Sequence, residues 1–126
     1  MAKSVPQTPS APPAMGPYSF ATEAGGLVFL SGQVALDPMT GERRTDDVAD
    51  QSHQVMKNIG AILGDLGLEY SDIVKSTIFL ADIDAYPAVN EVYGSYFDLE
   101  PPARSAIQAG ALPGGFLVEI EVVAAR

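Results

Sequence analysis

Cysteine is absent from this chain of 126 residues, and histidine occurs once, at His53. The absence of cysteine excludes disulfide bonds, thiolate nucleophiles, iron–sulfur clusters and every zinc site that needs a cysteine ligand. A single histidine also excludes histidine-rich metal sites and weakens any proposal of a serine–histidine–aspartate triad. His53 lies within a predicted helix beside glutamine and serine, where we expect a structural role.

Basic residues are scarce as well. Seven lysines and arginines stand against sixteen acidic residues, giving a net charge of −9, and the only adjacent basic pair is Arg43-Arg44. Binding to nucleic acid needs clustered positive charge, so we expect no nucleic-acid partner. No apolar run approaches the ~18 residues of a membrane-spanning helix. Four prolines between residues 6 and 13 stand where a secretory signal peptide would need its apolar segment. We therefore expect a cytoplasmic protein without a membrane partner.

The composition that remains is that of one globular domain. Hydrophobic residues make up 47% of the chain and charged residues 18%, which suits a folded core and not a disordered segment. Residues 1–15 are rich in proline, serine and alanine and show no periodicity, so we expect an extended, partly mobile arm. Residues 16–126 form the predicted domain.

Periodicity predicts five strands and two helices in the order β-β-α-β-α-β-β. Alternating or β-branched segments predict strands at 18–21, 27–31, 73–81, 103–109 and 116–124. The first helix is expected to begin at an N-cap Thr45 and to end before Gly67, and the second to begin at an N-cap Asp84 and to end at Pro101-Pro102. This order predicts an α+β fold with both helices on one face of a single sheet.

The second face of that sheet is expected to carry both apolar and acidic side chains. Along the last strand Val118, Ile120 and Val122 share one side, whereas Glu119, Glu121 and Val123 share the other. An uncovered face of this kind favours self-association. We therefore expect an oligomer.

Three charged residues stand out as candidates for chemistry: Arg104, Glu119 and Glu121 interrupt otherwise uncharged or hydrophobic segments. Two carboxylates on one face of a half-buried strand raise each other's pKa, which is one way to make a general acid or base. Arg104 could equally neutralise both glutamates across adjacent strands as a structural ion pair, and the spacing leaves both interpretations open. Ser31 before Gly32 and Tyr18 after a stiff Gly16-Pro17 turn are weaker candidates for a pocket.

In combination, these segments resemble the Rid family of reactive intermediate deaminases, also called the YjgF or L-PSP family. The resemblance rests on short motifs that follow in the family's order across about residues 14–126: Gly16-Pro17-Tyr18-Ser19, Leu30-Ser31-Gly32-Gln33, Asp72-Ile73-Val74-Lys75, Val89-Asn90-x-x-Tyr93, Pro102-Ala103-Arg104-Ser105, Leu112-Pro113 and Val118-Glu119-Ile120-Glu121.

The resemblance implies a chorismate-mutase-like fold, assembled as a homotrimer with clefts between subunits. It implies hydrolytic deamination of reactive enamines and imines of the 2-aminoacrylate type to 2-oxo acids and ammonia. It implies no cofactor and no metal, and a small carboxylate-bearing substrate.

The family's site residues carry over to positions of this chain. Arg104 would bind the substrate carboxylate through both arms of its guanidinium, and Glu119 would position or activate the attacking water. Tyr18 and Ser31 would line the cleft and help to orient substrate or water, Tyr18 as a third catalytic residue and Ser31 as a substrate-binding one. Asn90 would be a polar substrate-binding residue near the cleft, and Glu121 would support the site or lie at an interface. The backbone of Ser105-Ala106 would hold the nitrogen end of the substrate.

Two departures from the best-known deaminases leave the substrate open. Ala106 stands where a cysteine is frequent, and the segment Asp98-Leu99-Glu100-Pro101 is shorter. The short segment is more similar to the branch that includes the aminoacrylate deaminase of pyrimidine breakdown, and another branch acts on 2-aminomuconate. Two further alternatives remain: a non-catalytic metabolite-binding or regulatory protein, and an endoribonuclease acting as a translation inhibitor, which the charge of −9 opposes.

Overall fold

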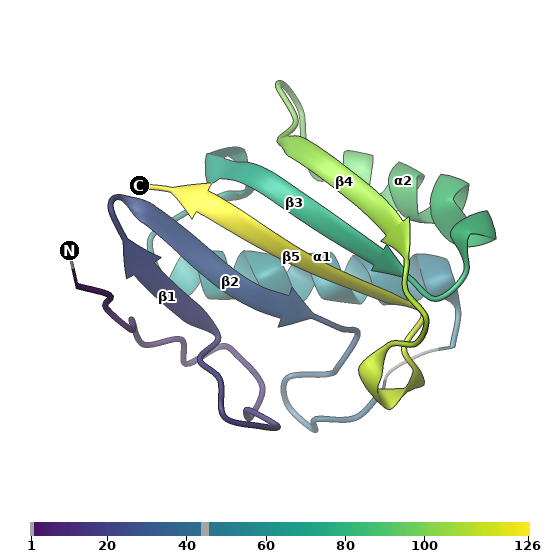
Figure 1. Ribbon diagram of the computed structural model, residues 1–126, viewed down its shortest axis with the longest axis horizontal. Coiled ribbons are helices and arrows are strands. Elements are labelled where there is room, and N and C mark those ends of the chain that lie inside the picture. Colours follow the sequence, from purple (N-terminus) through teal and green to yellow (C-terminus); the bar gives the residue numbers. More distant parts are fainter. Residues whose placement is uncertain (1, 44–45) are drawn as a thin grey trace.

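The computed structural model describes residues 2–43 and 46–126 and contains the predicted elements in the predicted order (Figure 1). The bounds are β1 Ala21–Ala24, β2 Leu27–Gln33, α1 Val48–Asp65, β3 Ile73–Leu80, α2 Tyr86–Gly94, β4 Ala103–Gln108 and β5 Val118–Ala125. Short 3₁₀ turns at Tyr70–Asp72, Ile83–Ala85 and Pro113–Gly115 connect them. The predicted α+β class is confirmed.

The five strands form one sheet in the order β1-β2-β5-β3-β4. β3 and β4 are parallel, and the other neighbours are antiparallel. The Gly25-Gly26 turn joins β1 and β2 in a hairpin, with both glycines at positive φ. The first strand, however, lies at Ala21–Ala24 and not at 18–21, because the two-residue turn pairs Ala24 with Leu27 and thereby sets the register.

Helix α1 is amphipathic and covers the sheet. Its N-cap is Asp47, whose carboxylate accepts a hydrogen bond from the Ala49 backbone N–H at 2.9 Å. The predicted cap Thr45 lies outside the described residues, and the helix starts at Val48. The predicted end is confirmed, because Gly67 follows the helix at φ +73°.

Helix α2 is shorter than predicted. Asp82 caps the 3₁₀ turn Ile83–Ala85, and α2 itself begins at Tyr86, so Asp84 is not the N-cap. Pro87 occupies the first turn, as its missing N–H allows. The helix ends at Gly94, well before Pro101-Pro102. The chain turns after Gly94, and the rings of Tyr96 and Phe97, which follow the helix, pack against the core.

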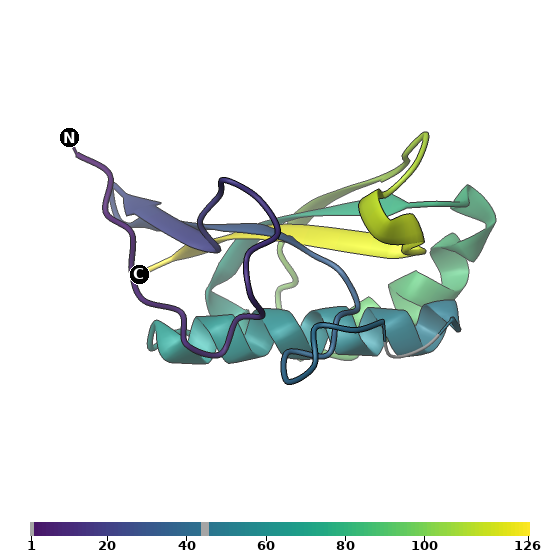
Figure 2. The ribbon, with the colours of Figure 1, turned by 90° about the horizontal axis from the view of Figure 1, so that it is seen from below.

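Both helices lie on the same side of the sheet, as Figure 2 shows. The core between the layers comes from α1, α2 and the helix-facing residues of the strands. Its largest fully buried apolar side chains are Val28, Val55, Met56, Ile59, Ile62, Leu63, Ile78, Leu80, Val89, Val118 and Ile120. The predicted alternation of β5 is confirmed, because Val118, Ile120 and Val122 are buried while Glu121 is exposed.

Within the described residues, neither α1 nor α2 lies on the other face of the sheet (Figures 1 and 2). Large apolar side chains remain accessible there, with Phe29 43% exposed and Ile107 49% exposed. We call this surface the open face. Its apolar character agrees with the prediction of self-association.

The N-terminal segment is attached to the domain at two places. Ser4 forms an antiparallel bridge with Glu23, and the backbone N–H and hydroxyl of Ser10 both donate to the Asp65 carboxylate, at 2.8 and 2.7 Å. Pro12 is buried. The segment therefore follows the edge of the fold from β1 to the end of α1; its predicted mobility stays a prediction. In the part of the chain that the structure describes, no helix is long and apolar enough to cross a membrane.

Two glycines of α1 offer a matched test of this packing. A Cβ at Gly60 would overlap the phenol of Tyr70, which donates to the Met56 carbonyl at 2.7 Å, whereas a Cβ at Gly64 meets nothing within 4 Å. We expect Gly60→Ala to lower the free energy of unfolding by about 1–3 kcal/mol through overpacking. We expect Gly64→Ala to raise it by about 0.5–1 kcal/mol, since alanine favours helix.

Urea unfolding of both variants at one protein concentration measures the two effects. Equal changes of the same sign would contradict the close Gly60–Tyr70 packing.

Candidate functional site

Arg104 lies on β4, the edge strand of the sheet, and its side chain faces the helix layer. The register places Arg104 beside Ser76 and Ala106 beside Ile78, both of which are buried under the helices. Side chains alternate along a strand, so Ser105 and Ile107 face the opposite side. The guanidinium therefore reaches over α2.

Helix α2 holds this guanidinium by two hydrogen bonds. Arg104 Nη1 donates to Asn90 Oδ1 at 2.7 Å and Nη2 donates to Tyr86 Oη at 2.6 Å. Tyr86 and Asn90 are four residues apart and so project from one face of the helix. The ring of Tyr93 lies 5.1 Å from the Arg104 Cζ, within cation–π range.

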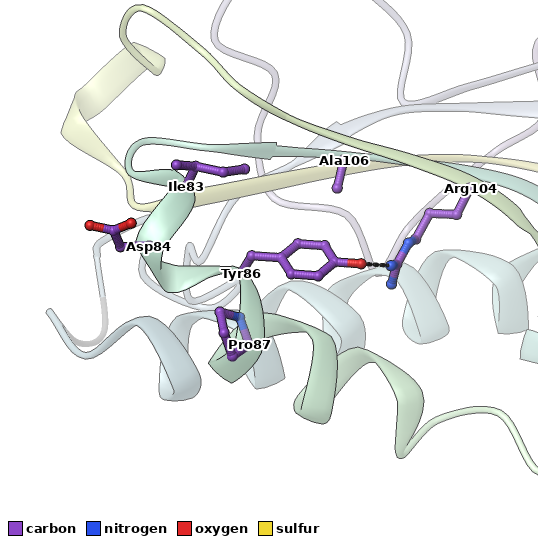
Figure 3. A pocket seen from close by; sticks show the side chains of 6 residues that line it. All are labelled: Ile83, Asp84, Tyr86, Pro87, Arg104 and Ala106. Atoms are coloured by element: carbon purple, nitrogen blue, oxygen red, sulfur yellow. Dashed lines mark hydrogen bonds between the residues drawn. The ribbon is translucent and has the colours of Figure 1, made fainter.

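An open pocket of about 610 Å³ adjoins this arrangement, lined by Ile83, Asp84, Tyr86, Pro87, Arg104 and Ala106. We call it the arginine pocket (Figure 3). Figure 3 shows the Tyr86 ring extending along it, with its hydroxyl directed at the guanidinium. A permanent cation with free N–H groups in a pocket is suited to binding a carboxylate.

Glu119 lies elsewhere, on β5, and faces away from the helices. Burial, and after it the charge of Glu121, raise the pKa of Glu119 above its ordinary value. A carboxylate with a raised pKa can exchange a proton nearer neutral pH. The predicted electrostatic coupling of the two glutamates is thus present.

Around Glu119 lies a second pocket, of about 550 Å³, which we call the glutamate pocket. Its lining comes from the N-terminal segment, the end of β2, the turn before β5 and β5 itself: Pro12, Pro13, Met15, Tyr18, Phe20, Ser31, Gly32, Gln33, Val34, Leu36, Pro113, Gly114, Phe116, Glu119 and Glu121. Tyr18 and Ser31, both predicted to line a cleft, lie here. The Ser31 hydroxyl donates to the Ser19 carbonyl at 2.6 Å, so towards a ligand its oxygen can only accept.

Gly32 allows the glutamate to lie where it does. A Cβ at this position would overlap the Glu119 carboxylate. The carboxylate is therefore packed directly against the backbone of β2, which contributes to its burial.

The structure separates the predicted site residues into two groups. Arg104, Asn90 and Ala106 belong to the helix side of β4, whereas Tyr18, Ser31, Glu119 and Glu121 line the glutamate pocket. Ser105 lines neither pocket, and its hydroxyl accepts from Lys75 Nζ at 3.5 Å. The alternative of an Arg104–glutamate ion pair within one chain is wrong, because β3 separates β4 from β5 and the side chains face opposite sides.

Sequence reasoning missed Tyr86 as a pocket residue, and it missed the contact of Gly32 with Glu119. Tyr86 binds Arg104, and its spacing of four from Asn90 on a predicted helix was the available signal. Gly32 on β2 leaves room for the Glu119 carboxylate of the neighbouring strand β5. No local sequence pattern predicts a contact between residues so far apart in the chain. Among residues 2–43 and 46–126 no group of three or more acidic or histidine side chains could hold a metal ion.

Comparison with known proteins decides the family. The sequence model described as endoribonuclease L-PSP matches residues 8–126, nearly the whole chain. The chain belongs to the L-PSP family. The predicted Rid, YjgF or L-PSP relationship is thereby confirmed.

Relatives within the L-PSP family carry deaminase names. The chain is 49% identical to the chloroplastic Reactive Intermediate Deaminase A of Arabidopsis thaliana, over 97% of this chain and 65% of that protein. It is 44% identical to the human 2-iminobutanoate/2-iminopropanoate deaminase, over 93% of this chain and 85% of that protein. These relatives bear out the predicted kind of enzyme.

Solved structures of similar proteins support the fold. Escherichia coli TdcF, described with bound serine, superposes with a TM-score of 0.91 at 39% identity, covering 98% of both chains. The predicted YjgF-type fold is confirmed by the YjgF gene product of Escherichia coli, whose structure superposes with a TM-score of 0.89 at 37% identity, covering 99% of both chains. Serine is a small carboxylate, and the description places it on TdcF, not on this chain.

Proposed function

We propose that this chain hydrolyses reactive 2-imino and enamine acids of the 2-aminoacrylate type to 2-oxo acids and ammonia. The observation that carries the proposal is the arginine pocket, in which Asn90 and Tyr86 orient the Arg104 guanidinium beside open space. The deaminase names of relatives at 44–49% identity support the same reaction.

Arg104 is suited to hold the carboxylate of such a substrate. A guanidinium has five N–H donors, and two of its nitrogens each use one donor on Asn90 and Tyr86. Donors remain for two parallel bonds to a carboxylate, which gives a planar substrate one orientation. Ala106, two residues along β4, leaves room beside the guanidinium.

Glu119 is suited to act on water. In its ionised form it would accept a proton from water as the water oxygen adds to the imine carbon. That proton passes to the imine nitrogen, which gives a neutral carbinolamine with a hydroxyl and an NH₂ group on the same carbon. Transfer of the hydroxyl proton to the nitrogen then releases ammonia as the C–N bond breaks and the C=O of the 2-oxo acid forms. Because burial and Glu121 raise the pKa of Glu119, its ionised fraction, and with it the rate, falls on acidification at a higher pH than for an ordinary glutamate.

The two pockets of one chain cannot serve one small substrate, since they open on opposite sides of the sheet. A second copy could bring its glutamate pocket to the arginine pocket of the first, and the apolar open face offers the contact surface. We therefore propose that the site lies in clefts between subunits, in the homotrimer that the family resemblance implies. Tyr18 and Ser31 would then meet the substrate from the subunit that supplies Glu119.

Binding without turnover is the competing function, because Arg104 serves it equally, and the serine bound to TdcF is an example of a bound small carboxylate in a relative. Nothing in the site favours RNA cleavage. The net charge of −9 opposes a polyanion.

The test generates 2-aminoacrylate in situ from serine with a dehydratase and follows pyruvate formation. We expect the unmodified protein to accelerate pyruvate formation. The Glu119→Gln variant should bind pyruvate normally, but its turnover should fall by about 100-fold or more, as for the loss of a general base. Glu42→Gln, an exposed glutamate outside both pockets, is the control. Full turnover by Glu119→Gln would refute the assigned base, and no acceleration by the unmodified protein would favour the binding function.

A further inference from the structure

Tyr86 is the partner of Arg104 that no motif predicted. It is the first residue of α2, its Oη lies 2.6 Å from Arg104 Nη2, and its ring centre lies 5.5 Å from the Arg104 Cζ. Its side chain lines the arginine pocket, as Figure 3 shows. It is thus both a support of the guanidinium and part of the ligand surface.

The direction of the Tyr86–Arg104 hydrogen bond determines what the hydroxyl can still do. A guanidinium only donates, so Tyr86 Oη accepts in this contact and its own proton must point elsewhere. Within the described residues no acceptor for that proton is recorded, and the hydroxyl borders the pocket beside the guanidinium. A donor left over at this place is available to a ligand.

We propose that the Tyr86 hydroxyl is a second hydrogen-bond donor to the carboxylate that Arg104 binds. The inference rests on the proposed function and extends it: the two carboxylate oxygens take the parallel N–H donors of Arg104, and one of them also accepts the O–H of Tyr86. The ligands favoured are planar monocarboxylates, of the size of 2-oxo and 2-imino acids, in which both oxygens lie in one plane beside the ring. A neutral amide, with one acceptor oxygen and an NH₂ group, fits this donor pair poorly.

Asn90 and Tyr86 therefore differ in role although both bind Arg104. Asn90 accepts from Nη1 and lies outside the residues that line the pocket, so it is a positioning residue. Tyr86 adds a donor of its own. A hydroxyl that bonds a charged group commonly strengthens binding by about tenfold or somewhat more.

The test measures pyruvate binding by calorimetry with the assembled protein. Tyr86→Phe removes the hydroxyl and keeps the ring over the guanidinium. We expect the Kd for pyruvate to rise about tenfold, the Kd for pyruvamide to change little, and KM to rise with kcat nearly unchanged. Tyr96→Phe is the matched control, since it removes a hydroxyl that contacts His53 Nδ1 at 2.9 Å, away from both pockets.

The outcomes separate this inference from the function on which it rests. If Arg104→Ala abolishes pyruvate binding and Tyr86→Phe leaves it unchanged, the second donor is refuted and the proposed function stands. A Tyr86→Phe variant with normal Kd and reduced kcat also refutes it, because the hydroxyl would then act only by orienting Arg104. Unchanged binding in Arg104→Ala would overturn both proposals.

Discussion

Replacing Arg104 by alanine is expected to lower kcat/KM for 2-aminoacrylate by about 100-fold or more, because a charge-assisted pair with the substrate carboxylate is lost. Arg104→Lys keeps the charge but not the planar fork. We expect its kcat/KM to be only slightly higher than that of Arg104→Ala. Lysine offers no parallel pair of N–H donors and cannot bond both Asn90 and Tyr86 as the guanidinium does.

The control for charge is Lys57→Ala, which removes an exposed cation from α1 without touching either pocket. Arg104 is half-buried and its partners lie at the surface of α2, so the variants should keep the fold and assembly, as size-exclusion chromatography and thermal unfolding can verify. Turnover by correctly assembled Arg104→Ala within a few-fold of the unmodified protein would exclude carboxylate binding by Arg104.

Mixed oligomers of two inactive variants are expected to regain activity. Within one chain Arg104 faces the helices from the edge strand and Glu119 faces the open side, so a complete site would take each from a different copy. When Arg104→Ala and Glu119→Gln chains are denatured together and refolded as mixed assemblies, about a quarter of the sites pair an intact arginine with an intact glutamate. We expect about that fraction of the unmodified turnover.

Mixing Arg104→Ala with Arg104→Lys provides the control, since both chains lack the same residue and no arrangement restores a site. Native mass spectrometry establishes that the subunits have exchanged and gives the number of subunits. Silent mixed assemblies of Arg104→Ala and Glu119→Gln would mean that one chain supplies both residues of each site, and the proposed subunit cleft would be wrong.

Sequence patterns predicted the element order and the sheet's two faces well, because they depend on short-range periodicity. The alternation along residues 118–123 fixes which side chains are buried whatever the neighbouring strands are. Element ends were predicted less well. β1 and α2 both start later than predicted. The register of the hairpin determines the bounds of β1, and the 3₁₀ turn capped by Asp82 precedes the start of α2.

The candidate site was predicted as a set of residues but not as an arrangement. Interrupted hydrophobic segments and turn residues singled out Arg104, Glu119, Tyr18 and Ser31, and the family resemblance added Asn90 and the roles. The division of these residues between two pockets depends on strand order. β4 is joined parallel to β3 and ends up at the sheet edge, two strands away from β5. A linear spacing of fifteen residues between Arg104 and Glu119 carries no information about that topology.

The contact between Gly32 and the Glu119 carboxylate couples two positions far apart in the sequence. A side chain at position 32 would occupy the space that the Glu119 carboxylate fills. Gly32 can therefore be replaced by a larger residue only if Glu119 is replaced as well. Among relatives that keep the fold, a residue larger than glycine at this position should therefore coincide with a shortened or neutral residue at the other. Such a pair of changes would identify, from sequence alone, family members that lack the glutamate proposed to act on water.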